Sequence, residues 1–378
     1  MITTINNKHK KLNVPNLRFK EFQGEWKKCK LLEICTFFSG GTPSSSNKDF
    51  YGGNIAFIRS GELHADSTEL FITQAGFDSS SAKMVEIGDL LLAMYGATSG
   101  DIAVSKIKGA INQAILCIRT KQNKKFIESV WNKHVSKNLR KYLQGGQGNL
   151  SADIIKGISF SFPTLKEQEK IANLVSLLDE RIATQNKIIE DLKKLKSAIS
   201  ENLFKAVKGD VVILSEICEI IKGKQVNSEF LSEKGKYYVM NGGTEPSGYY
   251  SDYNVEANTI SISEGGNSCG YVQFNTSPFW SGGHCYTIQK IADNVDHLYL
   301  YHYLKSKEDA IMKLRIGSGL PNIQKKGLAM FKIKLPTVEQ QKSISTFLSS
   351  LERKVEIEER TQKAMQKEKL YLLRQMFI

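Results

Sequence analysis

"PTLKEQEKI", residues 163–171, and "PTVEQQKSI", residues 336–344, are two nearly matching stretches that begin 173 residues apart. In each, a Thr is followed three positions later by Glu167 or Gln340, which is the capping-box pattern of a helix start. Because the residue before a proline avoids the helical conformation, the proline in each stretch separates the helix from the chain before it. The two stretches therefore predict two long helices that begin in the same way.

The similarity extends well beyond these nine residues. At the same offset, apolar residues match downstream and loop residues match upstream: Ile171, Leu174 and Leu178 with Ile344, Phe347 and Leu351, and Gly146, Asn149 and Leu150 with Gly319, Asn322 and Ile323. Three earlier segments recur in the same order: "LLEICTFFSG" (31–40) with "LSEICEIIKG" (214–223), "NIAFIRSG" (54–61) with "KYYVMNGG" (236–243), and "YGATSG" (95–100) with "EGGNSCG" (264–270). Such a repeat indicates one unit, a variable block followed by a long helix, that occurs twice.

Both blocks have the pattern of a mixed α/β fold. Short apolar or alternating runs such as "AFIRS", "DLLLAMYG" and "CYTIQK" are bounded by Gly, Ser and Asn, which is typical of strands. One helix is expected in each block, near 124–144 and 296–316. We expect a first domain at 1–162, a central spacer helix at 163–206, a second domain at 207–335 and a C-terminal spacer helix at 336–378.

The two long helices are expected to pack together as an antiparallel coiled coil. About forty residues of helix span about 60 Å, which exceeds what one block needs for its own core. Apolar residues at heptad spacing predict the helix–helix contact: Ile171, Leu174, Leu178, Ile188, Leu192, Leu195 and Ile199 in the first helix, and Ile344, Phe347, Leu351, Val355 and Leu372 in the second. Two independent surface helices are the alternative.

Composition narrows the functional classes. The chain has 378 residues and a formal net charge of +13, which favours a polyanionic partner, although a solvated basic surface is the other reading. The polar, lysine-rich start and the lack of a long apolar run lead us to expect a cytoplasmic protein. Six scattered cysteines without zinc-ligand spacing predict buried thiols and no metal.

The sequence offers no catalytic constellation and no cofactor motif. It contains neither a G-x-x-x-x-G-K-[ST] phosphate loop nor a G-x-G-x-x-G between a strand and a helix. No proline is followed by Asp or Pro, which argues against amino-methyltransferase and nuclease motifs, and the six histidines form no triad or H-E-x-x-H. A standalone enzyme is therefore disfavoured, and no cofactor is expected.

Loops at matching places in both blocks carry side chains that suit DNA base edges. Arg pairs with guanine and Asn or Gln with adenine in the major groove. The candidate DNA-binding residues are Gly41, Thr42, Arg59, Ser60, Thr98, Asn112, Gln113, Gln147 and Asn149 in the first block, and Lys224, Gln225, Asn241, Asn267, Ser268, His284, Arg315 and Asn322 in the second. A coiled-coil scaffold with a generic nucleic-acid-binding surface is the alternative function.

The chain resembles the DNA-specificity subunit of type I restriction-modification enzymes. The resemblance runs from about Leu17 to Phe377 and is carried by "NLRFKEFQGEWKKCKLLEI" at the start, "FSGGTPS" (38–44), "IGDLLLAMYG" (87–96), "INQAI" (111–115) and the two P-T-x-x-(E/Q)-Q helix starts. The second half differs more, with "KGKQVNS" replacing the Gly-Gly-Thr-Pro loop and "SGGHC" replacing "INQAI".

The resemblance implies a division of labour. Each block would be a target recognition domain that reads one half of a bipartite, asymmetric site in double-stranded DNA. The paired helices would space the domains and dock two modification (methyltransferase) subunits, which restriction subunits then join. Adenine methylation, ATP-dependent translocation and DNA cleavage would belong to those partners and not to this chain.

Overall fold

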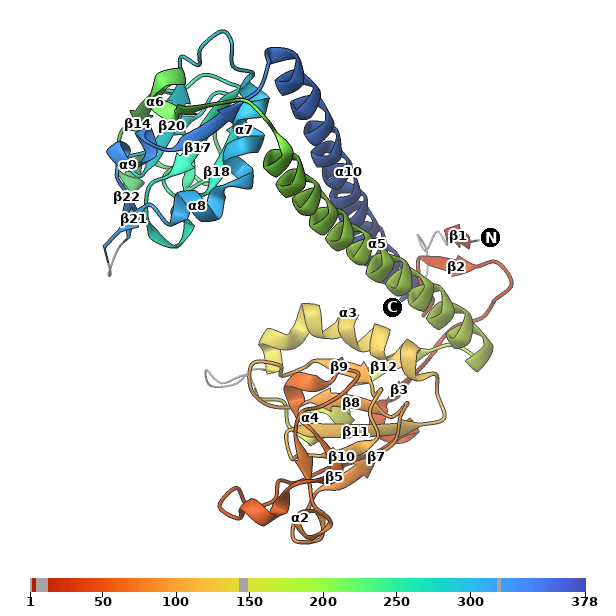
Figure 1. The fold of residues 1–378 in the computed structure, drawn as a ribbon. Helices are drawn as coiled ribbons and strands as arrows, with labels where there is room; N and C mark the ends of the chain where they lie inside the picture. Colours follow the sequence, from red (N-terminus) through yellow and green to blue (C-terminus); the bar gives the residue numbers. More distant parts are fainter. Residues whose placement is uncertain (1, 5–12, 143–148, 318–320) are drawn as a thin grey trace. The chain divides into compact units, whose positions relative to one another are not determined.

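The computed structural model describes residues 2–4, 13–142, 149–317 and 321–378. The chain divides into two compact units, Met1–Gln185 with Thr361–Ile378, and Asn186–Arg360. The long helices α5 (Leu165–Ala206) and α10 (Val338–Met376) contribute to both units and pack together (Figure 1). The predicted mixed α/β fold with two long helices is confirmed.

The first unit is built on a central antiparallel sheet. In spatial order its strands are β4 (Cys35–Ser39), β11 (Ile115–Thr120), β8 (Leu90–Ala93) and β9 (Ile102–Val104). Leu90 and Leu92 enter one hydrophobic cluster, whereas Leu91 and Ala93 enter another. This is the period of two that a strand imposes, and it explains why "DLLLAMYG" is apolar throughout: both faces of β8 are covered.

Smaller elements complete this unit. A second sheet has the order β6 (Phe71–Ile72), β5 (Tyr51–Ile58), β10 (Gly109–Ile111) and β7 (Lys83–Val85), and two strand pairs join β12 (Ser159–Phe162) to β3 (Lys27–Lys30) and β1 (Ile2–Thr4) to β2 (Leu17–Phe19). The helices are α1 (Leu31–Ile34), α2 (Gln74–Asp78), α3 (Lys124–Tyr142) and α4 (Ala152–Gly157), with 3-10 turns η1 (Lys48–Phe50) and η2 (Ser60–Glu62).

The second unit repeats this plan. Its central sheet has the order β14 (Glu219–Lys222), β20 (Cys285–Gln289), β17 (Thr259–Ser263) and β18 (Val272–Asn275). The other strands are β16 (Gly248–Tyr250), β15 (Tyr237–Met240), β19 (Trp280–Ser281), β13 (Asp210–Ile213), β23 (Lys332–Leu335), β21 (Arg315–Ile316) and β22 (Asn322–Ile323).

The helices of the second unit differ from the prediction in one place. They are α6 (Leu214–Ile217), α7 (His297–Ser306), α8 (Glu308–Met312) and α9 (Lys325–Ala329), with 3-10 turns η3 (Ser228–Phe230) and η4 (Gly266–Ser268). The single helix expected near 296–316 is two helices separated at Lys307, and Arg315 lies in a strand. The backbone leaves the helical conformation at Lys307, with φ −113° and ψ 17°, and the carboxylate of Glu308 accepts a hydrogen bond from the backbone N–H of Val272 on β18.

A buried glutamine explains why the two helix starts match. Gln168 and Gln341 are each 1% exposed, and the side-chain N–H of each donates to the carbonyl of its own proline, Pro163 or Pro336, at 2.9 Å. The side-chain oxygen of Gln168 accepts from the backbone N–H of Asn123 at 3.1 Å. The oxygen of Gln341 accepts in the same way from Asp296, at 2.8 Å.

The residues that these glutamines hold are themselves helix caps. The side-chain oxygen of Asn123 accepts from the N–H of Phe126 in α3, and that of Asp296 accepts from the N–H of Tyr299 in α7. Each glutamine therefore ties the start of a long helix to the start of the helix inside its block.

A capping box predicts that the Glu167 carboxylate accepts a hydrogen bond from the backbone N–H of Thr164, but the carboxylate has other partners. The N–H of Glu167 does approach the hydroxyl of Thr164, at 3.4 Å. Its carboxylate, however, accepts two hydrogen bonds from Arg18, each 2.8 Å, and a third from Trp26 at 3.3 Å. Arg18 and Glu167 are 5% and 1% exposed, so this buried bidentate pair fixes the N-terminal segment to α5.

The helix pair uses the same kind of contact in each unit. In the first unit Asp179 of α5 pairs with Lys369 of α10, and in the second Lys196 of α5 pairs with Glu352 of α10 at 2.7 Å. Lys193 pairs with Glu359 at 2.6 Å, so pairing residues run in opposite directions along the two helices, which are antiparallel. Asp179 and Glu352, like Lys196 and Lys369, are 173 residues apart, the offset of the helix starts.

Two of the seven predicted contact residues on α5 are exposed, and so is one of the five on α10. Ile188 and Leu195, which we expected in the helix contact, are 41% and 53% exposed, whereas Ile189 is 8% exposed. On α10, Phe347 is 46% exposed and Leu348 is 1% exposed. At 188–189 and at 347–348 the sequence carries apolar residues at both adjacent positions, and heptad spacing alone does not choose between them.

The remaining predicted helix-contact residues have varied surroundings. Ile171, which is 2% exposed, and the half-buried Leu174 and Leu372 belong to the core of the first unit. Ile199, Ile344 and Leu351 pack against the core of the second unit. Leu178 and Leu192 are half-buried and Val355 is 9% exposed.

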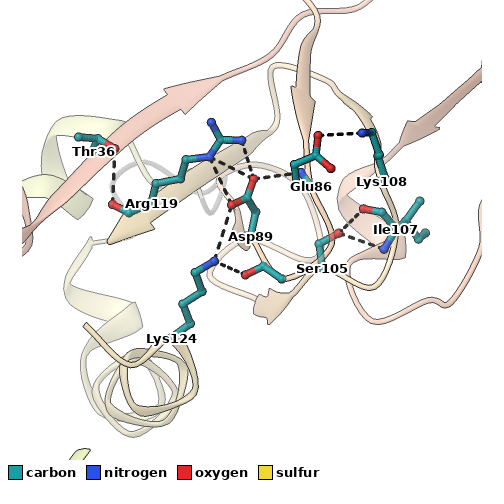
Figure 2. A network of polar contacts seen from close by, with 9 residues as sticks. Thr36, Glu86, Asp89, Ser105, Ile107, Lys108, Arg119 and Lys124 are labelled. Atoms are coloured by element: carbon teal, nitrogen blue, oxygen red, sulfur yellow. Dashed lines mark hydrogen bonds and ion pairs between the residues drawn. The ribbon is translucent and has the colours of Figure 1, made fainter. Parts of the chain in front are cut away.

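An acidic residue ahead of β8 contacts charged side chains from two elements, β11 and α3 (Figure 2). The carboxylate of Asp89 is 8% exposed, pairs with Arg119 at 2.7 Å and with Lys124 at 3.8 Å, and accepts from the N–H of Glu86 at 3.0 Å. Burial raises the pKa of Asp89, but the hydrogen bonds from Arg119 and Glu86 outweigh it, and the pKa lies below its ordinary value.

Replacing Gln341 with Leu should destabilise the chain. The substitution leaves the carbonyl of Pro336 and the amide of Asp296 buried without a partner, at a cost of about 2–4 kcal/mol. The neighbouring Gln340 is exposed, so Q340L is a matched control within about 0.5 kcal/mol of wild type. Thermal unfolding followed by circular dichroism compares the two, and equal melting temperatures would contradict the role given to Gln341.

The difference in exposure between Ile188 and Ile189 predicts opposite outcomes for charged substitutions at the two positions. I189D places a charge in the buried stripe and should cost about 3 kcal/mol or more, whereas I188D changes an exposed position by about 0.5 kcal/mol. Hydrogen exchange of the amides in α5 measures both. Greater loss of protection in I188D than in I189D would show that Ile188, and not Ile189, lies in the helix contact.

Asp89 should stabilise the first unit only above acidic pH. Because its folded pKa is lowered, its contribution is complete above the ordinary carboxylate pKa of about 4 and is lost as pH falls through the folded pKa. D89N should therefore lower stability by about 1–3 kcal/mol at pH 7, and the deficit should shrink below about pH 4. Urea unfolding across pH tests this, with D66N at an exposed ion pair as control; a deficit that grows on acidification would contradict it.

Candidate nucleic-acid interface

The predicted loops of the first unit gather at one end of its central sheet. Ser39 at the end of β4 pairs with Leu116, and Ala93 at the end of β8 pairs with Ile115. The parallel strands β5 and β10 end together, since Ile58 pairs with Ile111. The segments that follow these strand ends, 40–42, 59–62, 94–101 and 112–114, are therefore neighbours.

Two of these segments contact each other directly. The hydroxyl of Thr42 donates to the side-chain oxygen of Gln113 at 2.6 Å, and the N–H of Gly40 donates to the carbonyl of Asn112 at 3.3 Å. A Cβ at Gly40 would lie 1.7 Å from the carbonyl oxygen of Ile111, so this approach requires glycine. Asn112 closes its own turn by accepting from the N–H of Ala114, and Gly41 is buried, which leaves Thr42 and Gln113 exposed.

The charged candidate of this unit is already paired. Arg59 is about half exposed and makes a two-point contact with Glu62, at 2.6 and 3.2 Å. The hydrogen bond from Arg59 lowers the pKa of Glu62. Ser60, half-buried, begins the 3-10 turn η2 between them. Arg59 must therefore share or release Glu62 if its guanidinium is to contact a base.

The 94–101 segment extends the same surface. Thr98 is half-buried and its carbonyl accepts from the N–H of Asp101, whose carboxylate contacts His64 at 2.9 Å. The backbone N–H of Leu150 donates to the carbonyl of Met94 at 2.8 Å, which places the exposed Asn149 beside this loop. Gln147 lies outside the described residues.

The second unit brings its candidates together in the same way. Lys224 and Gln225 are exposed, and the N–H of Lys224 donates to the carbonyl of Ser281 at 2.8 Å. The side-chain oxygen of Asn241 accepts from the N–H of His284 at 3.1 Å. These four candidates therefore lie where β14, β15 and β20 meet.

A second group of candidates lies next to the first. Asn267 and Ser268 form η4, whose first residue, Gly266, donates its N–H to the carbonyl of Pro321 at 3.2 Å. Asn322 pairs with Gly265 in an isolated bridge, and Arg315, exposed on β21, pairs with Ile323. Backbone contacts among 265–266, 315 and 321–323 therefore hold this second group together.

Sequence reasoning missed the acidic residue between these two groups. Glu264, at the end of β17, is buried and contacts Lys222 at 2.6 Å, and its backbone N–H donates to the carbonyl of His284 at 2.9 Å. The sequence feature that could have pointed to Glu264 is a single acidic residue between a strand and two glycines in "SISEGG". His64 and Asp101 were missed in the first unit, where neither stands in a motif.

Equivalent positions in the two units hold different side chains. Strand registers place Arg59 where the second unit has Asn241, and Ala114 where it has His284. They also place Thr42 where it has Gln225. One scaffold therefore presents two different sets of hydrogen-bonding groups.

Nothing in the described part of the chain indicates a catalytic centre. No group of three or more His, Cys, Asp or Glu residues there is placed to hold a metal ion. Burial raises the pKa of the Cys117 and Cys218 thiols to about 12, which disfavours the thiolate that a nucleophile requires. None of the described helices is long and apolar enough to cross a membrane.

Comparison with known proteins agrees with the duplicated fold. Residues 23–194 and 207–367 each match the family of the type I restriction modification DNA specificity domain. A putative type I restriction enzyme MjaX specificity subunit from Methanocaldococcus jannaschii is 25% identical over 96% of this chain and 95% of its own. The EcoR124I/EcoR124II specificity subunit of Escherichia coli is 29% identical over 47% of this chain and 46% of its own.

Solved structures share the fold. The type I restriction-modification S subunit from M. genitalium has a TM-score of 0.67 and 19% identity, and the match covers 97% of this chain and 99% of that one. A chain from a type I restriction-modification system, solved in work on complex assembly and conformational transition, has a TM-score of 0.59 and 18% identity over 92% and 96%. Two consecutive family matches over most of its length show that this chain belongs to the type I restriction-modification specificity family, whose non-catalytic subunits recognise DNA sequence through two domains.

Proposed function

We propose that this chain reads a bipartite, asymmetric site in double-stranded DNA, one half with each block, and docks two modification subunits on its long helices. Residues 1–162 and 207–335 are the two target recognition domains in this proposal. Adenine methylation belongs to the modification subunits, and ATP-dependent translocation and cleavage belong to restriction subunits that join them.

One observation carries the proposal: the same scaffold positions hold different side chains in the two units. If both blocks read the same sequence, Arg59 and Asn241, or Thr42 and Gln225, would have no reason to differ in their hydrogen-bonding groups. Arg matches guanine and Asn matches adenine in the major groove. The substitutions therefore fit two readers with different half-sites.

Charge supports DNA as the partner. With a net charge of +13, the chain gains affinity for phosphates through counterion release. The exposed Lys224 adds positive charge where the candidate base-reading residues of the second unit are. Contacts to phosphate would set the register in which those residues meet the bases.

Exposed apolar side chains on the long helices support the docking of partner subunits. On α5, Leu177, Ile188 and Leu195 are 63%, 41% and 53% exposed. On α10, Phe347 and Ile357 are 46% and 48% exposed. Large apolar side chains with this much exposed surface, on helices that are already paired with each other, are suited to contact with a further protein.

Exchange of one block tests the division of labour. Replacing residues 31–157 with the equivalent segment of a relative leaves Arg18, Trp26 and both long helices intact. With the cognate modification subunit present, genome-wide mapping of methylated adenines should show a change in one half of the recognised motif only. The reciprocal control exchanges residues 214–329 and should change the other half.

The outcomes separate the alternatives. If either exchange altered both halves of the motif, the two-reader proposal would be wrong. If DNA bound equally well with no methylated motif, the chain would be a generic nucleic-acid-binding scaffold.

A further inference from the structure

The turn that leads into β11 carries two amide side chains, whereas the equivalent turn before β20 carries none. Strand registers place residues 112–113 of the first unit where the second unit has 282–283. The first turn reads Asn-Gln and the second reads Gly-Gly. Compared position by position, the second unit therefore lacks both amides.

An asparagine from a neighbouring loop replaces the first of these amides. In the first unit the side-chain oxygen of Asn112 accepts from the backbone N–H of Ala114 at 3.0 Å. In the second unit the side-chain oxygen of Asn241, which follows β15, accepts from the backbone N–H of His284 at 3.1 Å. Ala114 and His284 are equivalent residues, so the same backbone N–H is satisfied by an asparagine from a different loop.

A glutamine from a second neighbouring loop lies where the other amide would be. In the first unit the hydroxyl of Thr42 donates to the side-chain oxygen of Gln113 at 2.6 Å. Strand registers place Gln225 at the position of Thr42. The Gln225 side chain lies over Gly283, the equivalent of Gln113, because a Cβ added to Gly283 would stand 2.6 Å from Gln225 Oε1. The same two positions are thus in contact in both units, with the glutamine on opposite sides.

The two glycines of the second turn make room for these side chains. A Cβ added to Gly282 would stand 2.4 Å from the side-chain oxygen of Asn241, which is too close, and the Cβ at Gly283 would meet Gln225 in the same way. Neither glycine has a positive φ, so space and not backbone strain is the reason for glycine here. An Asn–Gln pair therefore occupies the same place in both units, although its sequence positions differ.

The glutamines are the exposed members of this pair, whereas the asparagines are half-buried and close the turn. The Thr42 hydroxyl occupies the oxygen of Gln113, so the N–H groups on Nε2 are the donors that remain. Nε2 of Gln225 donates to the carbonyl of Val226 at 3.3 Å, and its second N–H remains. Each unit therefore offers an exposed amide donor from the same place.

Two other side chains of this surface have no such counterpart. The position of Arg59 is held in the second unit by Asn241, which belongs to the Asn–Gln pair, and the position of His284 is held in the first unit by Ala114. Arg59 and His284 are 52% and 58% exposed. The candidates thus fall into two classes: the Asn–Gln pair that both units share, and the two side chains that make the units different.

We propose that Gln113 and Gln225 each donate a hydrogen bond to a phosphate oxygen of the DNA, and that Arg59 and His284 carry base discrimination. This inference rests on the proposed function, because it assumes that each block binds one half-site. A donor that is kept in both blocks while its sequence position changes suits a feature that two different half-sites share, and Gln side chains commonly contact phosphates. A base-reading group would instead differ between the blocks, as Arg59 and His284 do.

The first test separates loss of affinity from loss of discrimination. The full chain with its modification subunits binds labelled duplexes that carry the mapped site, or one base-pair change within its first half, and fluorescence anisotropy gives the dissociation constants. Q113A should weaken binding to all of these duplexes by about tenfold and leave their ratios unchanged, because every duplex has the phosphate. R59A should instead lower the ratio at one or two base pairs by about tenfold.

The matched control is Gln74, which is exposed on α2 and outside the candidate loops, and Q74A should bind as wild type does. If Q113A changed the ratio at a single base pair, Gln113 would read a base and the inference would be wrong. If wild type itself bound the intact and altered duplexes alike, the proposed function would fail instead.

A scan of the duplex with single uncharged methylphosphonates identifies the phosphate. At the contacted position the substitution should weaken wild type by about tenfold and leave Q113A unchanged, since the two changes remove the same hydrogen bond. Independent effects of Q113A and of the methylphosphonate at every position would overturn the phosphate contact.

The last test moves the glutamine of the second unit without removing it. The double variant Q225T/G283Q recreates the Thr–Gln arrangement of the first unit, because it removes the Oε1 atom that a Cβ at Gly283 would meet. Q225T alone should weaken binding by about tenfold, and the double variant should recover wild-type affinity with the second half-site unchanged. A double variant that melts like wild type but binds as weakly as Q225T would overturn the inference.

Discussion

The buried amide of Gln168, repeated at Gln341, is the interaction on which the architecture depends. Each side chain donates a hydrogen bond to the carbonyl of the proline that follows a strand. It also accepts one from the backbone N–H of the residue that caps a helix within the block. The first turns of each long helix also touch the core of the block, at Ile171 and Val175 in α5 and at Ile344 and Leu348 in α10. With both partners satisfied in a buried site, the amide sets the direction in which the helix leaves.

Each of the two long helices begins in one unit and ends in the core of the other. Phe204, at the end of α5, packs against Tyr299 in the core of the second unit, with ring centroids 5.7 Å apart. Phe377, after α10, packs against Phe126 in the first unit at 5.2 Å. Both phenylalanines stand 173 residues apart, as do their partners. A duplicated sequence can make this exchange only if its helices run antiparallel, which is the direction that the Lys193 and Lys196 ion pairs show.

The fold could be predicted from the sequence to the extent that it depends on repetition and period. Matching segments located both blocks, and continuous apolar runs located β8. The buried residue at 188–189 of α5 could not be predicted, because Ile188 and Ile189 are both apolar and only the partner helix decides which is buried. The break at Lys307 was also hidden, because no glycine or proline marks it in the sequence.

The candidate site was predicted less well, for a reason that bears on specificity. Loop positions such as Asn241 and Asn322 became candidates because they recur in the repeat. Glu264 was missed because its importance comes from a buried oxygen that lacks a partner, which no local pattern reveals. When two blocks share one scaffold, the sequence repeat identifies only the features that both blocks have in common. Residues that distinguish one block, such as Glu264, which stands where the first block has Met94, must be sought at positions where the two halves of the sequence do not match.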